Sequence, residues 1–107
     1  METTDKLGQI RKGFLELAIL TLISARKVYV AEMLEALEKT EFKTQEGTLY
    51  PLLSRLRREG TVEYEWVESE SGPPRKYYRL TPSGLTELEK LSQYSKHIST
   101  VISSLAK

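Results

Sequence analysis

Apolar residues between positions 10 and 25 spread around most of a helical circumference instead of forming a single stripe. After Gly13, only Glu16, Thr21 and Ser24 interrupt the run. A helix that is apolar on more than one side must be covered on more than one side. In a chain of 107 residues, we expect the second cover to come from a partner chain. The polar residues 1–9 predict a flexible N-terminus.

Two further helices are predicted between residues 30 and 59. The second helix covers residues 30–39, and the third begins with Thr44 as N-cap and ends near Glu59. Gly60 follows at the position where a left-handed C-cap residue belongs. Pro51 removes one backbone hydrogen bond inside the third helix, so we expect a kink or an irregular first turn. Leucines at helical spacing place one face of this helix in the core: Leu49, Leu52, Leu53 and Leu56.

Alternating polar and apolar residues then predict a two-stranded hairpin. Its strands cover residues 61–68 and 75–81, and a loop rich in Ser, Gly and Pro covers residues 69–74. Symmetric pairing about the loop places Glu63 opposite Arg79, and we expect an ion pair between them. Aromatic residues in a hairpin usually belong to the core, so a ligand-stacking cluster is the less favoured interpretation. The four side chains concerned are Tyr64, Trp66, Tyr77 and Tyr78.

A long final helix follows, with Thr81 as N-cap and Pro82 in its first turn. Over about 25 residues it would measure roughly 37 Å, which is more than so small a domain can cover. Its polar face is too mixed in charge for an anionic membrane surface, so we expect it to wrap around the partner's first helix. The apolar residues expected at this dimer contact are Phe14, Leu88, Leu91, Tyr94, Ile98, Val101, Ile102 and Leu105.

This order of elements is that of a winged helix-turn-helix protein. The predicted fold is mainly α with a small β-wing: residues 10–81 form the DNA-binding domain and residues 82–107 the C-terminal dimerisation helix. The net charge is only +1, so a DNA-binding surface must come from local segregation of charge. Such segregation is present, because residues 43–59 and 75–79 are basic on balance whereas residues 62–70 are acidic.

The residues available for chemistry argue against an enzyme. The chain contains no cysteine and one histidine, His97, so disulfides and thiolate sites are excluded and we expect neither a metal nor a cofactor. The late serines lack a plausible base apart from His97, which we expect at the surface or at an interface. No apolar run approaches the roughly 20 residues that span a bilayer, and no secretory signal precedes the domain. We therefore expect a cytoplasmic protein without membrane contact.

Polar and basic side chains lie opposite the leucine stripe of the third helix. In a helix-turn-helix protein, the first residues of this helix approach base edges while later cations reach phosphates. Gln45 can pair with adenine, although its helical angle places it near the edge of the core. A solvated polar face is the alternative, since every amphipathic helix has one. The candidates for DNA contact are Lys43, Thr44, Gln45, Thr48, Ser54, Arg55 and Arg58, with Arg75 and Lys76 of the hairpin.

Two blocks of sequence resemble the PadR family of bacterial transcriptional repressors. They read GTLYPLLSRL at positions 47–56 and GPPRKYYRLTPSG at positions 72–84, with Gly60 between them, and the similarity runs over about residues 10–91. The resemblance implies a dimeric DNA-binding repressor of the compact branch, which has a single C-terminal helix. It also implies that Tyr50 places its hydroxyl on a phosphate, whereas packing at the helix edge is the alternative.

The resemblance further implies an effector. Some short members of the family stack flat hydrophobic drugs on a tryptophan of the last helix, and this chain has Ser95 at the aligned position, beside Tyr94. These two residues are the candidates for binding a small apolar or aromatic effector. We thus expect a sequence-specific regulator, a dimeric repressor of an inverted-repeat operator in double-stranded DNA. The alternative is a winged-helix protein–protein interaction module that does not bind DNA.

Overall fold

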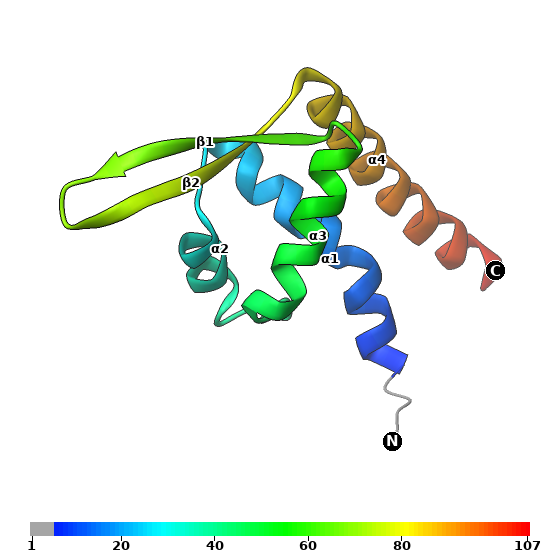
Figure 1. Cartoon of the computed structure of the whole chain (residues 1–107). Helices are drawn as coiled ribbons and strands as arrows, with labels where there is room; N and C mark the ends of the chain where they lie inside the picture. The colour runs from blue at the N-terminus through cyan, green and yellow to red at the C-terminus, as the bar shows by residue number, and fades with distance from the viewer. Residues whose placement is uncertain (1–5) are drawn as a thin grey trace.

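A computed structural model describes residues 6–107, and its elements follow the predicted order (Figure 1). The fold class predicted from the sequence is confirmed: three helices, a two-stranded antiparallel wing and a long last helix. The wing projects from one side of the helices, and the last helix leads away on the other (Figure 1). The described elements are α1 (Lys6–Ala25), α2 (Val30–Leu37), α3 (Glu46–Arg58), β1 (Val62–Ser69), β2 (Gly72–Leu80) and α4 (Pro82–Leu105).

The core lies between the first three helices and the base of the wing. Helix α3 contributes its leucine stripe, of which all but the half-buried Leu52 is fully buried. Each buried leucine or isoleucine contributes roughly 1.5–3 kcal/mol to stability relative to an exposed position. The fully buried side chains are Ile19 and Leu20 of α1, Met33 of α2, Leu49, Leu53 and Leu56 of α3, and Val62 of β1.

Two helix starts differ from the prediction. Helix α1 begins at Lys6, so residues 6–9, predicted to be part of a flexible N-terminus, are helical, while residues 1–5 lie outside the described part of the chain. Helix α3 begins one residue later than predicted, with Gln45 rather than Thr44 as N-cap and no side-chain capping hydrogen bond. The amides of Thr48 and Leu49 both donate to the Gln45 carbonyl, at 3.0 and 3.1 Å, so the first turn is irregular.

Helix α3 ends as the sequence predicts. Gly60 has φ of +79°, the left-handed region that glycine enters at little cost. Its amide donates to the Arg57 carbonyl at 3.0 Å, and the Thr61 amide donates to the Leu56 carbonyl at 2.9 Å. This is the Schellman pattern of hydrogen bonds, which satisfies the last carbonyls of the helix and turns the chain directly into β1.

The wing pairs in the predicted register but has a shorter loop. Glu63 lies opposite Arg79, as expected. Strand β2 begins at Gly72, however, so Pro73 and Pro74 belong to the strand and not to the predicted loop over residues 69–74. Proline is tolerated there because a two-stranded sheet consists of edge strands, in which alternate amides need no partner.

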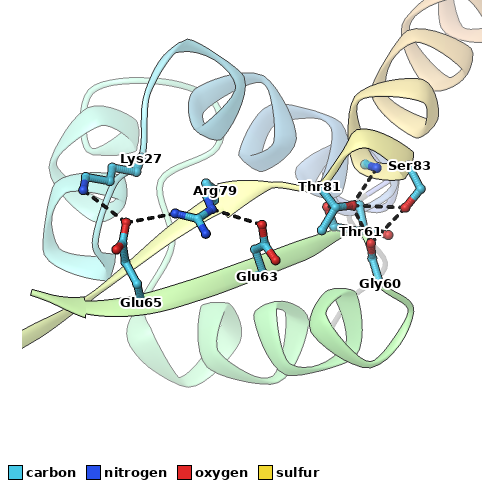
Figure 2. A network of polar contacts seen from close by, with 9 residues as sticks. Lys27, Gly60, Thr61, Glu63, Glu65, Arg79, Thr81 and Ser83 are labelled. Carbon is cyan, nitrogen blue, oxygen red and sulfur yellow. Dashed lines mark hydrogen bonds and ion pairs between the residues drawn. The ribbon is translucent and has the colours of Figure 1, made fainter.

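Hydrogen bonds at the base of the wing join the residues that precede β1 to the residues that follow β2 (Figure 2). The Thr81 hydroxyl, at the predicted N-cap of α4, accepts the Gly84 amide at 2.9 Å and donates to the Gly60 carbonyl. The Ser83 hydroxyl donates to the same carbonyl at 3.0 Å. The start of α4 is therefore attached to the end of α3, so the orientation of the last helix follows that of α3.

Candidate nucleic-acid interface

The centre of the exposed face of α3 carries small side chains. Gly47, Pro51 and Ser54 follow one another along its centre, and Arg58 continues the line at the C-terminal end. All four are exposed, whereas the leucines occupy the opposite face. A helix with a small-residue stripe lets another surface approach its backbone closely. Ser54 and Arg58 were both predicted as DNA contacts, and the structure leaves both accessible.

A cleft of about 300 Å³ borders α3 on its wing side. It brings together three predicted contact residues from two separate segments: Tyr50 of α3 with Arg75 and Lys76 of β2. Tyr50 is not buried by packing at the helix edge, since 44% of its surface is exposed. The full lining is Tyr29, Val30, Tyr50, Trp66, Pro74, Arg75, Lys76 and Tyr78.

The cations of this wing-side cleft contact aromatic rings. The Lys76 ammonium lies 4.4 Å from the centre of the Tyr64 ring, and the Arg75 guanidinium lies 4.7 Å from that of Tyr29. The guanidinium of Arg57, which was not among the predicted DNA contacts, lies 4.7 Å from the centre of the same Tyr64 ring that Lys76 contacts. Within residues 6–107 none of these three cations forms a salt bridge, so their charge is not neutralised by carboxylates.

A second groove, of about 290 Å³, borders α3 on the opposite side. It collects the predicted Lys43, Thr44 and Thr48, and adds Arg11 and Lys12 from α1. Sequence reasoning missed these last two, because the first helix was expected to serve only the core and the dimer contact. The signal available in the sequence was that these two cations are adjacent near the start of the first helix. The groove also contains Glu41, which lies 3.7 Å from Arg11, while Lys43 pairs with Glu38 at 3.2 Å.

Comparison with known proteins identifies the family. Residues 19–90 match the transcriptional regulator PadR-like family. The chain belongs to this family. A PadR-like regulator from Bacillus cereus is 40% identical, with a TM-score of 0.81, over 92% of this chain and 97% of that one. A PadR-like transcription factor from Bacteroides fragilis is 39% identical, with a TM-score of 0.80, over 94% and 98% of the two chains. A PadR family regulator from Eggerthella lenta is 27% identical but has a TM-score of 0.87, over 97% and 91%.

Arg55 of this PadR-like chain is bound within the molecule. Its guanidinium donates to Glu16 of α1 at 2.6 Å and to Glu59 at 3.0 Å. The hydrogen bond to Glu16, and then that to Glu59, raises the pKa of Arg55 above its ordinary value. The side chain thus joins α3 to α1. Gln45, expected near the edge of the core, is instead exposed at the N-cap.

The outer face of the PadR-like wing carries a charge network (Figure 2). The predicted ion pair is confirmed, with Arg79 Nε at 3.0 Å from Glu63, and Arg79 also reaches Glu65 at 3.0 Å. Lys27 joins the same carboxylate at 3.1 Å. The hydrogen bond to Glu63 is the main reason why the pKa of Arg79 is raised. Arg79 therefore holds the strands together and does not belong to the wing-side cleft.

The aromatic residues of the wing only partly form the core. Tyr78 is buried and Tyr64 is half-buried, as predicted. Tyr77 is half-buried and packs edge-on against Tyr29 at 5.1 Å between ring centres. For Trp66 the prediction is wrong, because 63% of its surface is exposed. It lies farther along β1 than Tyr64 and borders the wing-side cleft, which leaves its ring open to solvent.

The apolar residues predicted for a dimer contact divide into two groups. Leu88 and Leu91 pack against the core of their own chain, which gives them a role without any partner. The others leave an exposed apolar stripe on α1 and α4, which reaches 77% exposure at Leu105 and is extended by Leu7 and Ile10. The exposed members predicted from the sequence are Phe14, Tyr94, Ile98, Val101, Ile102 and Leu105.

Both candidate effector residues line one groove between α1 and α4. The groove has a volume of about 270 Å³ and contains Tyr94 and Ser95 beside Phe14 and Leu17. The Ser95 hydroxyl donates to the Ser92 carbonyl at 2.8 Å. No group of three or more metal-ligating side chains occurs within residues 6–107, and none of the helices in that range is long and apolar enough to cross a membrane. His97 is exposed, with its ring 6.4 Å from that of Tyr94.

Proposed function

We propose that this PadR-like regulator is a homodimeric cytoplasmic repressor that binds an inverted-repeat operator in double-stranded DNA through α3, without catalytic activity or a cofactor. The observation that carries the proposal is that α3 has basic clefts on both of its flanks. On the wing side are Arg75 and Lys76, and on the α1 side are Lys12 and Lys43. The major groove, which admits a single helix, is likewise bordered by two phosphate strands.

The exposed stripe of α3 supports the same assignment. A recognition helix must place its first turns against base edges while residues on its flanks contact the backbone. Small side chains at Gly47 and Ser54 permit that approach, and Arg58 lies one turn beyond Ser54, where a phosphate contact is expected. Thr48 and Tyr50, on opposite flanks, would donate their hydroxyls to the two strands.

The apolar stripe on α1 and α4 supports a two-fold dimer. Exposed side chains such as Ile102 and Leu105 would be costly in a monomer, and a contiguous patch of this kind marks an interaction surface. A two-fold axis through this contact would direct two α3 helices towards successive major grooves, about 34 Å apart. Because α4 is attached to the end of α3 through Thr81, the dimer contact fixes the spacing of the two α3 helices.

An effector would act through the same connection. A small apolar or aromatic molecule in the groove that contains Tyr94 and Ser95 would separate α1 from α4 and change that spacing. The repressor could then be released from its operator without any contact between the effector and the DNA. A matched test is to ask whether a flat aromatic ligand lowers operator affinity, with Ser95→Leu, which narrows the groove without adding an aromatic ring, as the variant expected to lose the response.

The central experiment is a titration of fluorescently labelled duplex DNA at several salt concentrations. A repressor is expected to bind the duplex with an affinity that falls steeply with salt, since each phosphate contact releases counterions. Fragments selected from the source genome should converge on an inverted repeat. The alternative function, an interaction module without DNA binding, predicts no salt-sensitive binding to any duplex, and that result would reject the proposal.

A further inference from the structure

We propose that Trp66 is a DNA-backbone contact: its indole packs against a deoxyribose of the strand that runs through the wing-side cleft, while Lys76 and Arg75 neutralise the adjoining phosphates. The inference rests on the proposed function and adds to it a residue and a mode of contact. It concerns the face of the wing that carries Trp66 and Lys76. It does not concern the tip of the wing, where the two strands turn.

The first observation is the exposure of Trp66. Tryptophan normally buries a large apolar surface, yet Trp66 is 63% exposed, whereas Tyr64, two residues earlier on the same face, is half-buried. The ring lines the wing-side cleft together with Tyr50 of α3. A surface that lies against α3 would therefore cover Trp66 at the same time.

The second observation is the pairing of Trp66 with a cation. Lys76 is its partner across the two strands, and the ammonium lies 5.3 Å from the centre of the indole ring. Tyr64 packs edge-on against the indole, with 6.3 Å between the ring centres. The side chain is thus held in place before any ligand arrives, and an apolar ring lies directly beside a positive charge. A sugar–phosphate unit presents the complementary pair, an apolar deoxyribose face beside a negative charge.

The third observation is the distribution of charge along the wing. Two cations border the cleft, Lys76 on the face that carries Trp66 and Arg75 on the opposite face beside Tyr29; both contact aromatic rings and form no salt bridge within residues 6–107. The end of the hairpin instead carries Glu68 and Glu70, both exposed. A phosphate strand is repelled by the tip and attracted to the cleft that both cations border. This charge pattern favours a strand seated in the cleft over a wing tip inserted into the minor groove.

The consequence is a contact without base readout. A ring that packs on a sugar, and a lysine that pairs with a phosphate, position the protein on the duplex but do not distinguish bases. Loss of Trp66 should therefore weaken binding to operator and to unrelated duplex by the same factor. Burial of one indole face corresponds to a loss of about fivefold in affinity.

The chain offers a direct probe, because Trp66 is its only tryptophan. Addition of duplex DNA should shift the emission of the protein and lower its quenching by acrylamide at least twofold, in parallel with binding measured by anisotropy of the labelled DNA. Trp66→Ala should weaken binding about fivefold without changing the salt dependence, because no charge is removed. Lys76→Ala should also lower the slope of log affinity against log salt, by about one for each subunit.

The controls separate this inference from the proposed function. Val67→Ala removes an apolar side chain from the opposite face of the same strand and should leave affinity unchanged. Trp66→Phe keeps a flat ring and should retain most of the affinity, and thermal unfolding reports whether each variant is folded. If the protein binds DNA with normal salt dependence while acrylamide quenching and Trp66→Ala affinity stay unchanged, the inference is wrong and the proposed function stands. Absence of all salt-sensitive DNA binding would reject both.

Discussion

The guanidinium of Arg55 on α3 lies 2.6 Å from the carboxylate of Glu16 on α1, although 39 residues separate them in the sequence. The contact joins the helix proposed to enter DNA to the helix proposed to form the dimer. It also explains why Arg55, which shares α3 with Arg58, has a different role. One arginine links two helices, and the other extends into solvent.

The Arg55–Glu16 pair should contribute modestly to stability. The two side chains are 43% and 24% exposed, so solvent screens the pair and its coupling free energy should be about 0.5–1 kcal/mol. Urea unfolding of Glu16→Gln, Arg55→Gln and the double variant measures that coupling. The same cycle on Lys43 and Glu38, an exposed pair at 3.2 Å, is the control and should give a smaller value. Equal coupling in the two cycles would show that the Arg55 contact has no special importance.

Arg58 should contribute to DNA binding through charge. Its removal should weaken binding to all duplex sequences and lower the salt slope by about one for each subunit. Arg55→Ala should lower the slope by less, since two carboxylates already occupy its guanidinium. Lys90→Ala removes the same charge from the exposed part of α4 and is the matched control. A salt slope identical in Arg58→Ala and Lys90→Ala would contradict the placement of Arg58 at a phosphate.

Ile102 offers the cleanest test of the proposed dimer. It is 62% exposed and lies on the apolar stripe of α4, so Ile102→Asp should leave the subunit folded and shift sedimentation velocity to the monomer. Thr100→Asp adds the same charge to another side of the helix and should sediment like the wild type. Leu91→Asp is a poor substitute, because Leu91 packs against the core of its own chain and its loss should also lower the unfolding temperature. An unchanged dimer in Ile102→Asp would place the contact elsewhere.

Local sequence rules predicted the frame of this fold well. The leucine spacing of α3, the left-handed Gly60 and the Glu63–Arg79 register each depend on positions within one element or one hairpin, so a short window of sequence contains the information. The position of Thr81 as N-cap is of the same kind. These expectations were confirmed because each feature depends on residues that are close in the sequence or paired within one hairpin.

Contacts between distant segments were harder to predict. The Arg55–Glu16 pair and the approach of Lys12 to the start of α3 depend on how two helices pack, which no single window contains. The exposure of Trp66 depends on how far β1 extends beyond α3, so the usual preference of aromatic residues for a core did not apply. Arg55 was likewise predicted as a DNA contact on α3, but its guanidinium is bound to Glu16, a residue of another helix.

Tyr78 should make stability depend on alkaline pH. Burial, and then the nearby Tyr50 and Tyr64, raise the pKa of its hydroxyl above 10.0, the ordinary value that applies in the unfolded chain. The folded state therefore keeps a proton that the unfolded state releases, and stability should be full below about pH 10 and fall as pH rises towards the folded pKa. Urea unfolding at pH 8 and at about pH 10.5 measures the loss, which should be smaller in Tyr78→Phe. Parallel losses in the two proteins would mean that Tyr78 ionises as it does in the unfolded chain.

Gly84 should be the least replaceable glycine of the described chain. A Cβ at this position would overlap the carbonyl oxygen of Thr61 and lie 3.0 Å from its carbonyl carbon, and backbone atoms cannot move aside without shifting α4. Gly84→Ala should therefore cost about 1–3 kcal/mol in the free energy of unfolding.

The same substitution at Gly47 is the matched control for Gly84. Beyond the adjoining part of its own helix, no atom lies within 4 Å of a Cβ built there, and alanine is the better helix former, so Gly47→Ala should keep or raise stability by up to about 1 kcal/mol. On the exposed stripe of α3, the added methyl group should nonetheless weaken DNA binding, while folded Gly84→Ala should alter it only through the orientation of α4. Urea unfolding and anisotropy titration of both variants measure the two effects separately. Equal losses of stability would show that the Thr61–Gly84 approach is not tight, and that the attachment of α4 to α3 relies on the hydrogen bonds of Thr81 and Ser83.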